Sequence, residues 1–193
     1  MILVFASGFG SNFDAIANAF PDKIAGLVCN KEGAGVLEKA QAKQIPCYLI
    51  PHKNFSSRIE HEKKILNAIL PLKKVKLIVL AGYMRILSPY FFAEMSKNPF
   101  PPLLINLHPA YLDQYKGAHA YEHVVEQKFP YSGLSIHEVT DELDAGPLIN
   151  SASFPVFPYE KVEELQARAR SLEHKILVDT IAPLLEPYDK HTI

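Results

Sequence analysis

Asn106 and His108 lie two positions apart in the stretch INLHP, at the end of an apolar run over residues 103–108. Side chains two positions apart in a strand leave the same face of the sheet, and Pro109 ends the strand there. An amide donor beside an imidazolium can stabilise the negative charge of a tetrahedral intermediate formed from a carbonyl group. The spacing therefore indicates an oxyanion site. A purely structural interpretation, in which His108 ends a strand and Asn106 satisfies a turn, stays open at this point.

The acidic segment DELDAGP, residues 141–147, follows the next expected strand. Its Ala-Gly-Pro turn could hold Asp144 inward, toward His108. A carboxylate near His108 would raise the pKa of the imidazole and favour its charged form. Taken alone, the segment is explained as simply by an acidic loop in solvent.

A second chemistry competes for the neighbouring residues, because His119, Glu122 and His123 spell the inverted zinc-protease motif H-x-x-E-H. Two histidines four positions apart share a helix face, but a zinc site would need a further ligand from elsewhere in the chain. The match fixes only three residues in a chain with eight histidines, and no distant motif supports it. We therefore expect no metal, and interpret the segment as a helix start with His119 at the margin of a site and His123 exposed.

The stretch ASGFGSN, residues 6–12, joins the first expected strand to the first expected helix. Gly8 and Gly10 allow positive φ, and a helix N-terminus points amide donors at an anion. The stretch lacks the third small residue of a dinucleotide fingerprint and the Walker lysine, so a nicotinamide cofactor is not expected. Phosphate binding and a simple tight turn both fit. Arg170 and Glu173, one helical turn apart, could meet a phosphate and a sugar diol or form a surface pair.

The elements that must position these residues alternate along the first half of the chain. Apolar runs predict strands, and helical spacing predicts the intervening helices. The expected strands are 2–7, 24–30, 46–50, 75–82 and 103–108, and the expected helices are 11–20, 36–44 and 56–70, the last with Ser56 or Ser57 as its N-cap. This order predicts an α/β fold whose parallel sheet has helices on both faces. All parallel strands then end at one edge, where such sheets bind ligands.

The second half of the chain has a different pattern. Residues 132–139 and 148–156 alternate between apolar and polar, which predicts strands with one wet face in an antiparallel arrangement. A long amphipathic helix is expected over 160–185. The sequence contains no internal repeat, low-complexity tract or linker, so we predict one domain over residues 1–193.

The composition narrows the classes of protein. A net charge of −1 and a pI near 6.7 give no electrostatic reason to expect nucleic acid or an acidic membrane as partner. The apolar opening is short and has no basic leader, and no segment is long enough to span a membrane. Cys29 and Cys47 lie in apolar stretches without C-x-x-C spacing, which predicts buried thiols in a reducing compartment. We expect a soluble cytoplasmic protein.

In order and spacing, the motifs resemble the folate-dependent formyltransferases, and among them the branch that acts on glycinamide ribonucleotide in de novo purine biosynthesis. The resemblance runs nearly from end to end of the chain. It rests on SGFGSN, AGYMRILS, INLHP, KGAHAYEHVVE, SGLSIHEVTDELDAGP and RSLEH. It implies a formyltransferase fold, with a Rossmann-like, mostly parallel sheet and helices on both faces.

The resemblance also implies roles for individual residues. Asn106, His108 and Asp144 match the catalytic trio. The positions that match the nucleotide site are Gly10, Ser11, Asn12, Arg170 and Glu173. The positions that match the folate pocket are Arg58, Met84, Arg85, Ile86, Leu87, Asn106, Thr140, Asp141, Glu142, Leu143 and Asp144.

The implied reaction transfers a formyl group from 10-formyltetrahydrofolate, a co-substrate, to the amine of glycinamide ribonucleotide without a metal. Both partners are small molecules, and a homodimer is left open. Three residues depart from the family pattern: Phe9 in the phosphate loop, and Ala110 and Asp113 after His108. After Glu173 and His174, Lys-Ile-Leu also replaces the family's frequent Tyr-Pro.

Other functions remain open from the sequence. Formyltetrahydrofolate hydrolase shares the trio and gives the formyl group to water, but this relative carries an additional N-terminal regulatory domain. Methionyl-tRNA formyltransferase adds a C-terminal nucleic-acid-binding domain, for which we find neither residues nor basic charge. A non-catalytic nucleotide-binding module would explain the glycine loop but not the trio.

Overall fold

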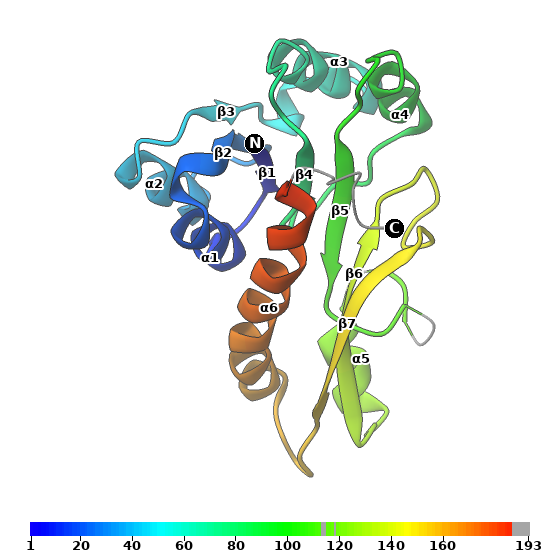
Figure 1. The fold of residues 1–193 in the computed structure, drawn as a ribbon. Coiled ribbons are helices and arrows are strands. Elements are labelled where there is room, and N and C mark those ends of the chain that lie inside the picture. Colours follow the sequence, from blue (N-terminus) through cyan, green and yellow to red (C-terminus); the bar gives the residue numbers. More distant parts are fainter. Residues whose placement is uncertain (113–114, 118, 187–193) are drawn as a thin grey trace, which may run out of the picture.

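A computed structural model of the chain describes residues 1–112, 115–117 and 119–186. These residues form a seven-stranded sheet with the order β3-β2-β1-β4-β5-β6-β7 (Figure 1). The strands are β1 (Ile2–Ala6), β2 (Ile24–Cys29), β3 (Cys47–Leu49), β4 (Leu77–Leu80), β5 (Leu103–His108), β6 (Tyr131–Glu138) and β7 (Leu148–Pro155). The strands from β3 to β5 are parallel, whereas β6 is antiparallel to both β5 and β7. The predicted change from parallel to antiparallel pairing is confirmed, but only β7 has the predicted wet face, because β6 is buried on both faces.

Helices cover both faces of the sheet, as predicted. They are α1 (Ser11–Ala19), α2 (Gly35–Ala42), α3 (Arg58–Ile69), α4 (Pro89–Met95), α5 (Ala120–Glu126) and α6 (Val162–Leu185), with 3-10 turns η1 (Pro21–Lys23) and η2 (His52–Asn54). In β1, Val4 belongs to the core that includes side chains of α1 and α6, whereas Phe5 belongs to the core that includes side chains of α3 and α4. A strand buried on both faces needs a continuous apolar run rather than an alternating one.

The expected element boundaries agree with the structure within a few residues. Ser57 is the N-cap of α3, and its hydroxyl accepts a hydrogen bond from the backbone N–H of Glu60 at 3.2 Å. The helix α4 was not anticipated from the sequence, although Ser88 before Pro89 is a typical helix start. It is too short to show a clear helical period.

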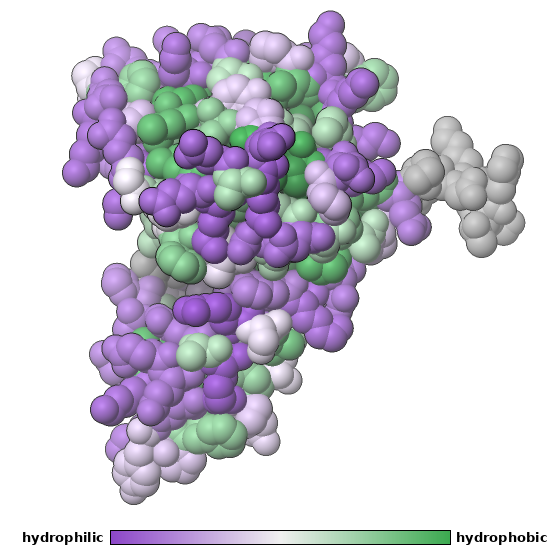
Figure 2. All heavy atoms as spheres, turned by 90° about the vertical axis from the view of Figure 1, so that its left-hand side faces the viewer, coloured by the Kyte–Doolittle hydropathy of each residue, from purple (hydrophilic) through white to green (hydrophobic). Residues whose placement is uncertain are grey.

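One expectation about the cysteines is wrong. Cys29 is buried, but Cys47 is exposed. Cys47 lies on β3, the strand at one edge of the sheet, so its environment is open on one side. Figure 2 shows the molecule from this side, where polar and apolar side chains are interspersed on the surface.

The order of the strands creates a natural place for a ligand. β1 pairs with β2 on one side and with β4 on the other, so the chain leaves β1 and β4 in opposite directions across the sheet. Loops that diverge in this way open a crevice at the carboxyl ends of the strands. In the part of the chain that the structure describes, no helix combines the length and the apolar character needed to span a membrane.

Candidate active site

A cavity of about 660 Å³ opens at the carboxyl ends of β4 and β5. Asn106 and His108, at the C-terminal end of β5, line this cavity together with Asp144 from the loop between β6 and β7. The structure thus brings together the three residues that the sequence assigned to the chemistry. A volume of this size suits a small-molecule ligand.

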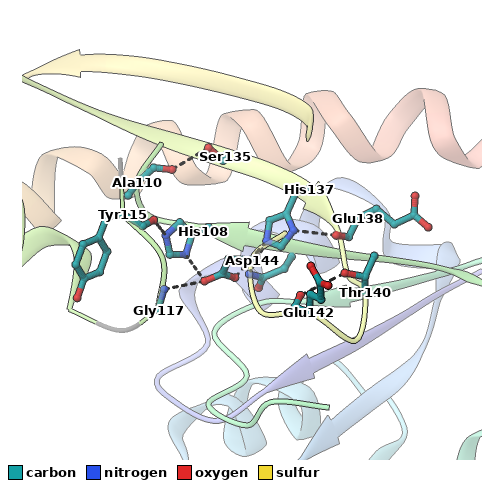
Figure 3. A network of polar contacts seen from close by, with 11 residues as sticks. His108, Ala110, Tyr115, Gly117, Ser135, His137, Glu138, Thr140, Glu142 and Asp144 are labelled. Carbon is teal, nitrogen blue, oxygen red and sulfur yellow. Dashed lines mark hydrogen bonds and ion pairs between the residues drawn. The ribbon is translucent and has the colours of Figure 1, made fainter. Parts of the chain in front are cut away.

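His108 and Asp144 are both buried, and their side chains face each other (Figure 3). His108 Nδ1 lies 3.6 Å from Asp144 Oδ2, while His108 Nε2 lies 2.8 Å from the carbonyl oxygen of Tyr115. The backbone N–H of Gly117 donates to Asp144 Oδ2 at 2.8 Å. Because a carbonyl oxygen only accepts, Nε2 must be the protonated nitrogen in neutral His108, and Nδ1 is the atom that gains a proton.

His137 is a member of this cluster that the sequence reasoning missed. It lies opposite Asn106 in the antiparallel pair of β5 and β6. His137 Nε2 is 3.2 Å from Asn106 Nδ2 and 3.5 Å from Asp144 Oδ1, and His137 Nδ1 lies 2.8 Å from the carbonyl oxygen of Glu138. A neutral His137 that donates through Nδ1 accepts one Asn106 N–H at Nε2, which fixes the plane of the amide. The available signal was a histidine within an expected strand that leads to the acidic segment 141–147.

The electrostatics of the pair differ from the expectation. Asp144 does act to raise the pKa of His108, but burial of the ring has the larger effect, so the pKa of His108 is lowered. Burial acts to raise the pKa of Asp144, yet the contact with His137, the hydrogen bond from the Gly117 N–H and the charge of a protonated His108 together lower it. Asp144 is therefore an anion over a wide pH range. Burial favours the neutral form of His108, and the negative charge of Asp144 opposes this effect.

The loop that carries Asp144 is tightly constrained. Asp144 has a φ of 48°, in the left-handed region that few non-glycine residues adopt. Two residues later, a Cβ added to Gly146 would lie 1.9 Å from the carbonyl oxygen of Glu138. Only glycine permits this close approach. The strained turn and the packed glycine together hold the carboxylate in the cavity.

A second group of side chains lies at another part of the cavity wall. Asn12, from the first turn of α1, donates through Nδ2 to Glu173 Oε2 at 3.1 Å. The hydroxyl of the buried Tyr121 donates to Glu173 Oε1 at 2.6 Å. Burial and the adjacent carboxylate raise the pKa of Tyr121, so its hydroxyl keeps the proton that it donates. Both oxygens of Glu173 are thereby held in the cavity wall.

The glycine-rich stretch of residues 6–12 leads into α1 and ends at Asn12. Gly10 has a φ of 81°, and it is the N-cap of α1, with Ser11 as the first helical residue. A Cβ at Gly10 would lie 2.6 Å from the side chain of Val36. The expected positive φ is thus found at Gly10, whereas Gly8 is not in the left-handed region.

Most of the residues predicted for the folate pocket line the cavity, but some predicted site residues do not. Those in the wall are Met84, Arg85, Ile86, Leu87, Asn106, Thr140, Glu142, Leu143 and Asp144. Arg58, at the start of α3, Asp141 and Arg170 are exposed and lie outside the wall, and the predicted nucleotide-site residues Gly10 and Ser11 are also outside it. Their roles stay predictions.

The alternative metal motif is not assembled as a cluster. His119 is the N-cap of α5, with a φ of 70°, and its Nδ1 lies 3.2 Å from Glu122 Oε1. His123 stacks on Tyr115 with 4.6 Å between ring centroids, so it is half-buried rather than exposed as predicted. Among the described residues, no group of three histidine, cysteine or acidic side chains is placed to hold a metal ion.

The departures from the family pattern are placed as follows. Phe9 is exposed outside the cavity wall, and Lys39 Nζ lies 4.6 Å from the centroid of its ring. Ala110 is buried, and its carbonyl oxygen accepts a hydrogen bond from Ser135 Oγ at 2.8 Å. Asp113 lies outside the described residues.

Comparisons with known proteins show the family to which the chain is related. Residues 1–181 match the family described as formyl transferase. A phosphoribosylglycinamide formyltransferase of Haemophilus influenzae is 37% identical over 180 residues, which cover 91% of this chain and 82% of that protein. The enzyme of the same name from Dictyostelium discoideum is 35% identical and covers 93% of this chain and 95% of its own.

Solved structures give the same result. The phosphoribosylglycinamide formyltransferase of Streptococcus pneumoniae TIGR4 superposes with a TM-score of 0.87 at 30% identity, covering 96% of this chain and 98% of its own. The family model, the relatives and the solved structure all name formyltransferases. The chain belongs to the formyl transferase family, among its phosphoribosylglycinamide formyltransferases.

Proposed function

We propose that the protein transfers the formyl group of 10-formyltetrahydrofolate to the amine of glycinamide ribonucleotide, a step of de novo purine biosynthesis. The observation that carries this proposal is the meeting of Asn106, His108 and Asp144 in one cavity, in a chain of the formyl transferase family. A nucleotide-binding module without catalysis would not explain this buried cluster, because burying polar and charged side chains costs free energy. We assign the whole activity to one domain over residues 1–193.

In the proposed reaction the neutral amine attacks the formyl carbon, and negative charge gathers on the formyl oxygen. Asn106 has one amide N–H directed to His137, and it offers the other to this oxygen. Charged His108 offers its Nδ1–H, because Nε2–H is held by the carbonyl oxygen of Tyr115. One such donor contributes about 10²–10³ in rate.

The proton balance assigns a role to Asp144. A carbon–nitrogen bond forms to the amine, the bond to the folate nitrogen breaks, and one proton must pass from the first nitrogen to the second. Asp144 supports the charged form of His108 against the effect of burial, and it can order a water that carries this proton. The reaction needs no metal in this scheme.

The two substrates occupy different parts of the cavity in this proposal. Glu173 and Asn12 meet the ribose and phosphate end of the nucleotide, with Gly10 and Ser11 at the N-terminus of α1. The apolar side chains of Ile86 and Leu87 face the folate ring. Holding both substrates beside the trio lowers the entropic part of the barrier. The thiols of Cys29 and Cys47, which are both free, fit a cytoplasmic location.

The test uses the purified full chain with 10-formyltetrahydrofolate, with and without glycinamide ribonucleotide, in the presence and absence of a chelator. We expect turnover only with the nucleotide, and no effect of the chelator. Release of formate without the nucleotide would favour the hydrolase, and loss of activity with the chelator would revive the zinc alternative.

A further inference from the structure

Glu62 is a buried carboxylate that the proposed chemistry does not use. It lies on α3 and is 1% exposed. Its Oε1 accepts the backbone N–H of Ser88 at 2.8 Å, and its Oε2 accepts the hydroxyl hydrogen of the same residue. Among the described residues, these are the hydrogen bonds that Glu62 receives. A buried carboxylate is costly unless its hydrogen bonds are satisfied, so its position needs an explanation.

The partner of Glu62 marks the end of a loop. Ser88 is the N-cap of α4, and it directly follows Met84, Arg85, Ile86 and Leu87, which line the cavity. By fixing both the backbone and the hydroxyl of Ser88, Glu62 fixes the point at which this loop enters α4. Hydrogen bonds to a charged acceptor are among the stronger ones in proteins.

A second buried side chain fixes the beginning of the same loop. Ser7 Oγ accepts the backbone N–H of Met84 at 2.8 Å and donates to Asn30 Oδ1 at 2.6 Å. The backbone N–H of Ser7 also donates to the carbonyl oxygen of Gly82 at 3.1 Å. Ser7 and Asn30 are both buried. The hydroxyl of Ser7 is therefore fully engaged, and its direction is set by Asn30.

Between these two anchors Tyr83 and Leu87 are buried in the core, but the other apolar side chains that face the cavity have less support. Met84 is 70% exposed and Ile86 is 48% exposed, although both line the cavity. Their positions depend on the backbone that carries them, and hence on the anchors. Ser7 differs from Glu62 in one respect: it also lies in the glycine-rich stretch of residues 6–12, which leads into α1.

We propose that Glu62 and Ser7 are positioning residues that hold the loop of residues 82–88 in its folate-binding shape, with Ser7 shared between the folate and nucleotide ends of the site. This inference rests on the proposed function, because it takes residues 84–87 as folate contacts. Neither residue touches a reacting atom. Loss of Glu62 affects the folate end alone, whereas loss of Ser7 affects both ends.

The test compares Glu62→Leu with Glu62→Gln. Leucine removes both acceptors, while the amide of glutamine can accept the Ser88 N–H and donate to its hydroxyl. We expect Glu62→Leu to raise the KM for 10-formyltetrahydrofolate about tenfold, the effect of losing a hydrogen bond to a charged group. The KM for glycinamide ribonucleotide should stay within about twofold, and Glu62→Gln should behave like the unaltered protein.

A control is available in Glu160, a half-buried carboxylate that accepts the backbone N–H of Phe157 at 3.0 Å and is also paired with Arg168. Glu160 is outside the cavity wall. Glu160→Leu should lower the melting temperature without changing either KM. Equal changes in both KM values for Glu62→Leu, or the same shift in the control, would overturn the inference by showing a merely structural role.

Two milder variants keep the inference falsifiable if Glu62→Leu does not fold. Ser88→Ala removes only the hydroxyl and should raise the folate KM by a few-fold, and Ser7→Ala should raise both KM values. Unchanged values in both would overturn the inference. A titration that measures the binding of tetrahydrofolate without turnover tests the positioning roles separately from the proposed function. Absent nucleotide-dependent turnover would contradict the proposed function, while equal affinity of all variants for tetrahydrofolate would contradict the positioning roles.

Discussion

His108 Nδ1 faces Asp144 Oδ2 at 3.6 Å, which is too long for a hydrogen bond but close enough for a strong charge interaction. His108 Nε2 is committed to the carbonyl oxygen of Tyr115. The proton that titrates on His108 is therefore the one beside the carboxylate. Asp144 stabilises the cationic imidazole that burial disfavours. The charge of His108 therefore depends on the carboxylate of Asp144.

Replacing Asp144 tests this relationship directly. In Asp144→Asn the negative charge is lost, so the pKa of His108 should fall further below its ordinary value of 6.5. The formyl oxygen then loses its charged donor, and kcat should fall by about 10²–10³. A histidine NMR titration and steady-state kinetics measure the two effects. Asp179→Asn, an exposed change on α6, controls for folding. A near-normal rate would remove Asp144 from the mechanism.

The stability of the protein in acid should depend on the same carboxylate. The pKa of Asp144 is lowered in the folded protein from 3.8, so folding favours the anion. The stabilisation is fully present about one pH unit above the unfolded pKa and is lost as the pH falls through the lowered folded pKa. Urea unfolding at pH 5 and pH 3 should show a smaller loss of stability for Asp144→Asn than for the unaltered protein. An identical loss in both proteins would contradict this sign.

Tyr121 should act on the nucleotide end of the site through Glu173. In Tyr121→Phe the 2.6 Å hydrogen bond to Glu173 Oε1 is lost, and the carboxylate gains freedom to turn. A hydrogen bond to a charged group predicts a rise of about tenfold in the KM for glycinamide ribonucleotide. The KM for 10-formyltetrahydrofolate should not change. Tyr131→Phe, at an exposed position on β6, is the matched control. A rise in the folate KM alone would show that Glu173 does not face the nucleotide.

Gly146 should be intolerant of any side chain. In Gly146→Ala the added methyl group would clash with the carbonyl oxygen of Glu138, and the turn that carries Asp144 must shift. Misplacement of a catalytic group by about 1 Å can cost about 10² in rate. Kinetics and a thermal melt would separate misplacement from unfolding. Gly8→Ala is a control for the thermal melt alone, because its methyl group meets nothing within 4 Å. Full activity of Gly146→Ala would show that the turn does not hold Asp144 in place.

The sequence predicted those features that depend on neighbours along the chain. The apolar run of β1 predicted a strand buried on both faces. Ser56 or Ser57 was predicted as the N-cap of α3, because capping is a local hydrogen bond, and the structure places the cap at Ser57. The two-residue spacing of Asn106 and His108 placed both side chains on one face of β5. The arrival of Asp144 beside them was expected from the family resemblance, since residues so distant in sequence meet only through the fold.

Other features were decided by tertiary structure, because they depend on what surrounds a residue in space. The pairing of β5 with β6 placed His137 opposite Asn106, and the edge position of β3 exposed Cys47. The pKa of His108 is lowered because burial outweighs the carboxylate, a balance that no sequence pattern contains. Spacing along the chain thus determined which groups could do the chemistry. The partners and the charge of these groups were decided by burial and strand pairing, because both depend on contacts between residues that are distant in the sequence.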